Sequence, residues 1–327
     1  MLRCAQQSLK TVIATAVAQN RQKAMSTASS RLDLEGIYPP IPTPFDDKEE
    51  IDYPALQRNI EKWSKIPFRG LTVHGSNGEY TYLTTDERID MVKKVRSWLP
   101  KDKLIIAGAG CESTRCTIKM SERMAEEGAD AVLVITPSYY KGGMTSEALT
   151  NHFVKVADAS PVPVILYNVP KFTTIELTVE AILALAKHKN IIALKESSGN
   201  VAKIGHIVHR TKGEDFTVLA GSADHILQSH VVGASGGICA LANVLGEEVC
   251  RLYELCRTGD IAAATLLQHK LIGPNAAVTS KFGVPGLKFA MEQFGYYGGD
   301  PRSPLLPLAK EKQSLLLSLF QEDQFLK

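Results

Sequence analysis

A lysine directly follows a short apolar run in the segment NIIALKESSG, residues 190–199. The run Ile-Ile-Ala-Leu predicts a strand that is buried on both faces. An ammonium at Lys195, the next position, would lose hydration, and this loss favours the neutral amine. A neutral amine can attack a carbonyl carbon and form a Schiff base. The alternative is an ordinary lysine whose ammonium reaches solvent or pairs with Glu196.

Polar residues also follow other apolar runs. Tyr167 ends the run PVPVILYN, about one strand–helix unit before Lys195, and a phenol there could relay protons during addition to a carbonyl. In HGSNGE, Ser76 and Asn77 lie between two glycines, a composition suited to holding a carboxylate with backbone N–H groups. Taken alone, Tyr167 could be a core aromatic and the segment 75–78 an ordinary turn. Their combination with Lys195 favours catalysis on a keto acid.

Eight short apolar runs, separated by helical patterns, must position these residues. The runs are residues 37–41, 71–73, 104–107, 131–135, 162–166, 191–194, 216–219 and 236–241. This alternation predicts parallel βαβ units, and continuous apolar strands predict a sheet covered on its outer face. Eight such units favour a (β/α)₈ TIM barrel, in which active-site groups lie at the carboxyl ends of the strands. A doubly wound sheet is the alternative, but no G-x-G-x-x-G motif follows the first run.

The barrel is expected to occupy residues 33–260, with a helical extension over residues 261–327. Within the barrel, Thr84 with Glu87 three positions later predicts a capped helix start, and Ser113 predicts another. Further helices are expected over residues 262–280, 285–294 and 307–320. We expect the extension to pack on the barrel or to take part in contacts between subunits.

The first 32 residues differ in charge from the rest of the chain. They contain five basic residues and no acidic one, whereas the 327-residue chain as a whole has a net charge of only +2. A basic, hydroxyl-rich leader of this kind predicts a mitochondrial targeting segment and a matrix location, with a disordered tail as the alternative. The remaining chain has no basic excess, which argues against a nucleic-acid partner. No apolar run approaches the ~20 residues that a membrane span needs.

Cysteine and histidine patterns indicate neither disulfides nor a metal site. The six cysteines form no C-x-x-C pair, and the eight histidines are scattered without the spacing of a metal-binding motif. We therefore expect reduced thiols and a reaction that needs no metal and no dissociable cofactor.

The motifs GSNGE, TPSYY, YNVP and LKESSG, in this order and spacing, resemble the dihydrodipicolinate synthase/N-acetylneuraminate lyase family of Schiff-base aldolases. The resemblance covers residues 36 to about 320. It implies that Lys195 forms the Schiff base and that Tyr167 handles protons and orients the substrate. It also implies that Ser76 and Asn77 bind the carboxylate of a small keto acid and link to the tyrosine.

The same resemblance implies roles for three further residues. Tyr139 would complete the proton relay from a neighbouring subunit, which implies a homotetramer built as a dimer of dimers. Ser197 would help to hold the distal carboxylate of the substrate, and Gly221 would contact the substrate through its backbone. If the backbone of TPSYY is extended, Tyr139 and Tyr140 point to opposite sides.

Other segments favour one branch of the family. GIYPPIPTPF, FRGLTVHGSNGEY, AGSADHI, PNAAVT and FGYYGG are similar to the branch that cleaves 4-hydroxy-2-oxoglutarate to pyruvate and glyoxylate in hydroxyproline breakdown. Phe172 stands where the bacterial synthases have an arginine for the second carboxylate, and Asn77 stands where the synthase and the sialic acid lyase typically have threonine. The alternatives are another pyruvate-dependent lyase or synthase of the family and a non-catalytic barrel.

Overall fold

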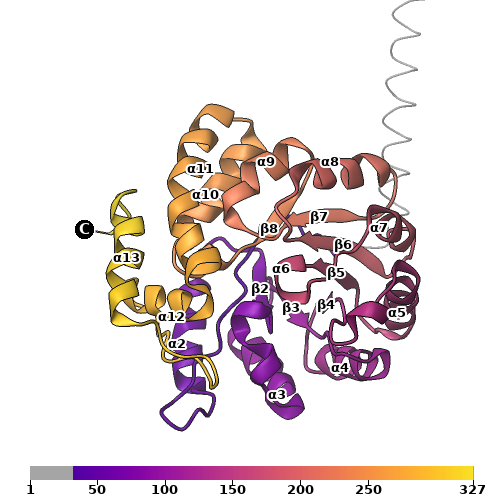
Figure 1. Cartoon of the computed structure of the whole chain (residues 1–327), viewed down its shortest axis with the longest axis horizontal. Coiled ribbons are helices and arrows are strands. Elements are labelled where there is room, and N and C mark those ends of the chain that lie inside the picture. The colour runs from indigo at the N-terminus through magenta and orange to yellow at the C-terminus, as the bar shows by residue number, and fades with distance from the viewer. Residues whose placement is uncertain (1–31, 327) are drawn as a thin grey trace, which may run out of the picture. The chain divides into compact units, whose positions relative to one another are not determined.

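Eight parallel strands form one sheet in the computed structural model, which describes residues 32–326. The strands are β1 (Gly36–Tyr38), β2 (Gly70–Val73), β3 (Leu104–Gly108), β4 (Ala131–Ile135), β5 (Val164–Asn168), β6 (Ile191–Glu196), β7 (Thr217–Ala220) and β8 (Gly236–Ile238). Each strand from β2 to β7 pairs with the next in the chain, and β8 pairs with β1. Helices surround the strands, so the predicted (β/α)₈ TIM barrel is confirmed (Figure 1).

The barrel closes between β1 and β2 through backbone hydrogen bonds. The N–H of Arg69 donates to the carbonyl of Ile37 at 3.1 Å, and further along the N–H of Thr72 donates to the carbonyl of Pro39 at 2.9 Å. β1 is shorter than the predicted strand 37–41. The reason is that Pro39 and Pro40 have no N–H to donate to a neighbouring strand.

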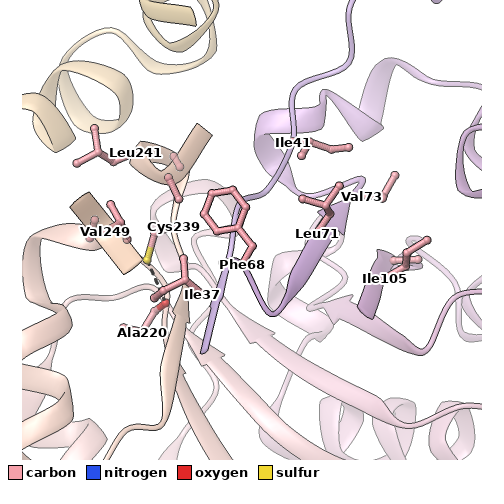
Figure 2. Close-up of a cluster of buried hydrophobic side chains, with 14 of the residues drawn as sticks. Ile37, Ile41, Phe68, Leu71, Val73, Ile105, Ala220, Cys239, Leu241 and Val249 are labelled. Carbon is pink, nitrogen blue, oxygen red and sulfur yellow. Dashed lines mark hydrogen bonds between the residues drawn. The ribbon is translucent and has the colours of Figure 1, made fainter. Parts of the chain in front are cut away.

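The core of the barrel follows from the two-sided burial of its strands. Every residue of β2, β3, β5 and β6 is buried. Figure 2 shows Ile37 and Phe68 from the first units packed near Cys239 and Val249 from the last unit. Contacts of this kind join the two ends of the barrel sequence into one apolar cluster.

Nine helices of the barrel are described between residues 32 and 260. They are α2 (Tyr53–Trp63), α3 (Thr85–Trp98), α4 (Thr114–Glu126), α5 (Ser146–Ala159), α6 (Pro170–Thr173), α7 (Val179–Leu185), α8 (Val201–Arg210), α9 (Ile226–Val231) and α10 (Gly246–Thr258). The predicted capping box of Thr84 and Glu87 is confirmed at the start of α3, and Ser113 caps α4. None of the helices in the described part of the chain is both long and apolar enough to cross a membrane.

Three helices follow the barrel: α11 (Ile261–Ala276), α12 (Gly283–Gln293) and α13 (Lys310–Gln321). The single helix expected over residues 262–280 is in fact α11 followed by a π-helical turn, Ala277–Lys281. Pro274, which has no N–H to donate, lies inside α11 three residues before this turn. The extension is packed on the barrel: Asn59 of α2 exchanges hydrogen bonds of 2.8 and 2.9 Å with the backbone of Tyr297.

Strand ends also differ from the prediction. β5 and β6 each extend two residues past the expected ends at 166 and 194, so Tyr167 and Lys195 lie inside strands. The expected targeting segment, residues 1–32, lies outside the described residues except for its last position.

Candidate active site

Lys195 and Tyr167 are neighbours on adjacent strands at the carboxyl end of the barrel. The register of β5 against β6 places them side by side. The Nζ atom of Lys195 lies 4.0 Å from the centroid of the Tyr167 ring. The side chains are almost fully buried, with 3% of Lys195 and 5% of Tyr167 exposed. A primary amine is therefore held against a phenol in a largely dry environment.

Glu196, the next residue on β6, is occupied by other groups. Its carboxylate accepts hydrogen bonds from Asn168 Nδ2 at 2.9 Å and from the Ser198 N–H at 2.8 Å, and it pairs with Lys203 at 3.1 Å. Successive residues of a strand point to opposite faces, which separates Glu196 from Lys195. Within residues 32–326 no ion pair involves Lys195, so the alternative of a Lys195–Glu196 pair is not observed.

Ser76 connects a turn after β2 to the phenol. Its Oγ lies 3.3 Å from the hydroxyl oxygen of Tyr167. Ser76, Asn77 and Gly78 form a 3₁₀ turn in which the Gly78 N–H bonds back to the carbonyl of Gly75. The N–H groups of Ser76 and Asn77 have no hydrogen-bond partner among the described residues. Such paired N–H groups at the start of a turn are suited to binding an anion.

Both ends of this turn are held in an uncommon backbone conformation. His74 and Glu79 have φ values of 60° and 54°, in the left-handed region that non-glycine residues seldom adopt. His74 is fixed by its Nε2–H, which donates to the carbonyl of Arg88 at 2.7 Å, and Thr43 donates to the carbonyl of Gly78 at 2.7 Å. Burial, followed by the nearby Arg88 charge, lowers the pKa of His74 to about 3. The chain just before the turn is therefore anchored by a buried, neutral imidazole.

A cavity of about 230 Å³ brings the predicted residues together. Six of the seven line it: Ser76, Asn77, Tyr167, Lys195, Ser197 and Gly221. The seventh, Tyr139, does not. No group of three His, Cys, Asp or Glu side chains in the described part of the chain is arranged to hold a metal ion.

Ser197 and Gly221 are in close contact on one wall of the cavity. A Cβ atom on Gly221 would lie 1.9 Å from the Ser197 Oγ, so only glycine fits there. The Ser197 Oγ is buried and has no hydrogen-bond partner among the described residues. The N–H of Gly221 already donates to the carbonyl of Glu196 at 2.8 Å. Any further backbone contact by Gly221 must therefore use its carbonyl oxygen.

Tyr139 lies outside the cavity and is 76% exposed. The carboxylate of Glu112 accepts the N–H groups of Ser138 and Tyr139 at 3.0 and 2.9 Å and so fixes this loop. Tyr139 and Tyr140 were expected to point to opposite sides if the backbone is extended, and this condition is not met. The backbone turns at this point, and the two rings contact each other with centroids 5.1 Å apart.

Other lining residues carry no periodic signal in the sequence. They include Lys171 and Phe172 of α6, Asp224 and His225 after β7, and Val278, Thr279 and Ser280 of the π-helical turn. His225 Nδ1 is 2.8 Å from the hydroxyl of Ser229, and its Nε2 has no partner among the described residues. Burial lowers the pKa of His225 and keeps its imidazole neutral. The sequence signals for these residues are the segments AGSADHI and PNAAVT and the residue Phe172, which carry the resemblance to the family or depart from it.

Comparisons with known proteins identify the family of this chain. The model of the dihydrodipicolinate synthetase family matches residues 33–322. A probable mitochondrial 4-hydroxy-2-oxoglutarate aldolase of Emericella nidulans is 35% identical over 294 residues, which are 88% of this chain and 94% of that protein. A 4-hydroxy-tetrahydrodipicolinate synthase of Methanothrix thermoacetophila is 33% identical over 283 residues, 86% of this chain and 95% of that protein.

A solved structure is similar along its whole length. The chloride-inhibited dihydrodipicolinate synthase of Acinetobacter baumannii, complexed with pyruvate, has a TM-score of 0.85 and 26% identity. The match covers 90% of this chain and 100% of that one. From the family model, the relatives and the fold together, the chain belongs to the dihydrodipicolinate synthetase family of aldolase-type lyases.

Proposed function

We propose that this protein is a class I aldolase that cleaves 4-hydroxy-2-oxoglutarate to pyruvate and glyoxylate through an imine on Lys195. The observation that carries the proposal is the position of Lys195. Its amine lies 4.0 Å from the Tyr167 ring, in one cavity with the N–H groups of the turn Ser76–Gly78. An amine, a phenol and an anion-binding turn are the groups that a keto acid requires for imine formation.

In the first half of the reaction, the neutral amine of Lys195 attacks the C2 keto carbon. The Ser76–Asn77 side of the cavity holds the adjacent carboxylate. Tyr167, in contact with Ser76 at 3.3 Å, passes a proton to the carbinolamine oxygen. Water then leaves and a protonated imine remains on Lys195.

In the second half, Tyr167, which gave up its proton in the first half, accepts the proton of the C4 hydroxyl, and the C3–C4 bond breaks. The bonding electrons move into the protonated imine and give an enamine, while C4 leaves as the aldehyde carbon of glyoxylate. The enamine takes up a proton at C3, and water hydrolyses the resulting imine to pyruvate and free Lys195. The iminium serves as the electron sink, so the residues of the chain suffice for this sequence of steps.

Two observations support the dicarboxylate substrate over the other reactions of the family. The relative from Emericella nidulans carries the name of this activity. By the resemblance, Phe172, which is 63% exposed at the cavity, replaces the arginine that serves the second carboxylate in the bacterial synthases, and this argues against the synthase reaction. The second candidate is the synthase reaction, which is favoured by the names of the archaeal relatives.

The substrate is tested by assaying three reactions side by side with one enzyme preparation. These are cleavage of 4-hydroxy-2-oxoglutarate, cleavage of N-acetylneuraminate, and condensation of pyruvate with aspartate semialdehyde. We expect kcat/KM to be highest for the first, and Lys195→Ala to abolish it. A higher kcat/KM for either of the other two would reject the proposed substrate.

The proposal includes a homotetramer in the mitochondrial matrix. The acid-free leader and the mitochondrial name of one relative support the location, and the exposed Tyr139 supports completion of the site by a second subunit. Deleting residues 1–25 should abolish import and leave activity intact. Normal import of the truncated chain would contradict the location.

A further inference from the structure

A buried ion pair ties the anion-binding turn to the C-terminal extension. Glu79 directly follows the turn Ser76–Gly78 and has the left-handed φ of 54°. Its Oε1 lies 2.8 Å from the Nζ of Lys288 on α12, and only 1% of each side chain is exposed. Its Oε2 accepts the backbone N–H of Arg302 at 2.9 Å. Both carboxylate oxygens of Glu79 are thus held by the extension, and this fixes the backbone at the end of the turn.

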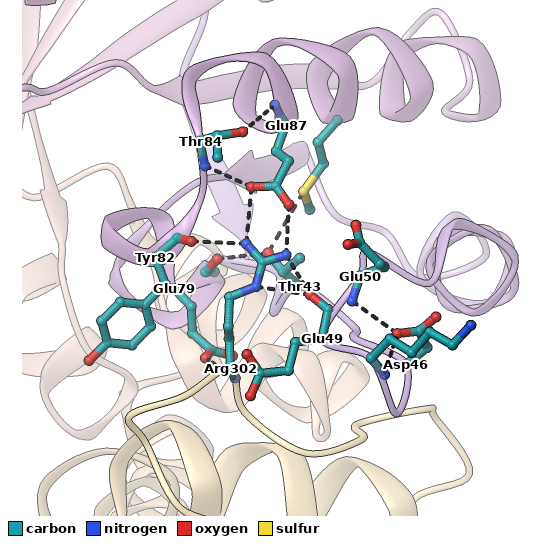
Figure 3. Close-up of polar contacts among 12 residues, drawn as sticks. Thr43, Asp46, Glu49, Glu50, Glu79, Tyr82, Thr84, Glu87 and Arg302 are labelled. Carbon is teal, nitrogen blue, oxygen red and sulfur yellow. Dashed lines mark hydrogen bonds and ion pairs between the residues drawn. The ribbon is translucent and has the colours of Figure 1, made fainter.

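The groups that hold Glu79 are themselves fixed. Lys288 also donates to the carbonyl of Asp300 at 2.8 Å, and its Nζ lies 4.5 Å from the ring centroid of Phe45. The guanidinium of Arg302 is bound by Glu87 at 2.6 Å (Figure 3). The extension therefore offers a rigid support rather than a mobile one.

Stability alone explains this pair poorly. Burial raises the pKa of Glu79 and lowers the pKa of Lys288, so burial disfavours the charged form of each residue. Replacing a buried ion pair with neutral groups of similar volume is often neutral or stabilising. A neutral pair would lose the contact between Glu79 Oε1 and Lys288 Nζ, which helps to fix the backbone of Glu79.

We propose that Glu79 and Lys288 are positioning residues for the carboxylate site of the enzyme. By fixing the end of the turn, they keep the Ser76 Oγ against Tyr167 and hold the N–H groups of Ser76 and Asn77 in place. The inference rests on the proposed function, in which this turn binds the carboxylate of pyruvate. Glu79 and Lys288, which do not line the cavity, then control substrate affinity without touching the substrate.

The test uses the full chain with the double substitution Glu79→Gln/Lys288→Met, which removes both charges and nearly preserves volume. The readout is the pyruvate concentration that gives half-maximal borohydride trapping. We expect it to rise about tenfold, as for the loss of one hydrogen bond to a charged group, while the thermal midpoint is unchanged or higher. We also expect KM to rise more than kcat falls. A purely structural role predicts a lower thermal midpoint with unchanged trapping by the folded protein.

Glu79→Asp is the second variant, since it keeps both charges and shortens the reach by one methylene. It should also raise the pyruvate concentration that gives half-maximal trapping. If the double variant does not fold, the result for Glu79→Asp decides whether Glu79 positions the turn. The control is Arg96→Met/Asp130→Asn, a partly buried pair at 3.3 Å whose Asp130 directly precedes β4, at the amino end of that strand. In this control variant, the pyruvate concentration that gives half-maximal trapping should be unchanged.

Wild-type trapping by a folded Glu79 variant would overturn the positioning role. Absence of trapping by the unmodified enzyme would instead contradict the proposed function on which the role depends.

Discussion

At the scale of single residues, the contact between Ser76 and Tyr167 is the most direct link between the anion-binding turn and the amine. Tyr167→Phe removes the hydroxyl and keeps the ring next to Lys195. We expect kcat to fall about 10²–10⁴-fold with little change in the thermal midpoint. Ser76→Ala should also slow turnover, and the double variant should lose less than the two single effects combined, because the two hydroxyls are 3.3 Å apart. Fully additive losses in kcat would mean that they act independently.

Gly221 gives a second prediction at this scale. The Cβ of alanine would come within 1.9 Å of the Ser197 Oγ and 2.7 Å of the Glu196 carbonyl oxygen, so Ser197 must move. We expect Gly221→Ala to reduce kcat/KM for the dicarboxylate by about tenfold or more, since a misplaced hydroxyl cannot hold the distal carboxylate. Gly273→Ala in α11, where the nearest atom is a flexible carboxylate oxygen at 3.3 Å, is the matched control. Equal kcat/KM for Gly221→Ala and Gly273→Ala would contradict the role of Ser197 in holding the distal carboxylate.

At the scale of elements, the turn after β2 depends on a histidine that stays neutral. The pKa of His74 is lowered to about 3 by burial, whereas the unfolded chain binds the proton near pH 6.5. The contribution of His74 to the free energy of unfolding is therefore at its full value above about pH 6.5. It decreases as the pH falls toward about 3, since the unfolded state gains the proton first. From about pH 7.5 to about pH 5, His74 should lower the unfolding free energy by about 2 kcal/mol.

His74→Gln tests this, because the amide can still donate to the Arg88 carbonyl and does not titrate. The loss of stability between the two pH values, measured by denaturant unfolding, should be smaller in the variant than in the wild type. Two other buried histidines with lowered pKa values, His152 and His225, remain in both proteins and contribute equally. An identical pH dependence of the unfolding free energy in the variant and the wild type would show that His74 is not kept neutral by burial in the folded state.

The elements of the barrel were largely predictable because each strand is a continuous apolar run between helical patterns. Lys195 and Tyr167 were predictable for the same reason, as polar residues at the ends of such runs. The π-helical turn Ala277–Lys281 was not, since nothing in its sequence, Ala-Val-Thr-Ser-Lys, excludes a regular helix. The left-handed conformation of His74 was also hidden, because the partner of its ring, the carbonyl of Arg88, lies 14 residues further along the chain.

At the scale of the whole molecule, Tyr139 requires a second subunit if it is catalytic, since it lies outside the cavity of its own chain. Mixing Tyr139→Phe with Lys195→Ala subunits should restore activity above that of either parent. Sites that combine Lys195 of the first variant with Tyr139 of the second would be complete. Verified subunit exchange without recovery would mean that Tyr139 acts within its own chain or has no catalytic role.

The central claim is that Lys195 forms an imine with pyruvate, and covalent trapping tests it most directly. The enzyme is incubated with pyruvate and sodium borohydride, digested, and mapped by mass spectrometry. We expect one reduced pyruvyl group on Lys195, with loss of activity that follows the extent of labelling. Labelling at Lys171 or Lys141 instead, together with an active Lys195→Ala variant, would contradict the proposed mechanism.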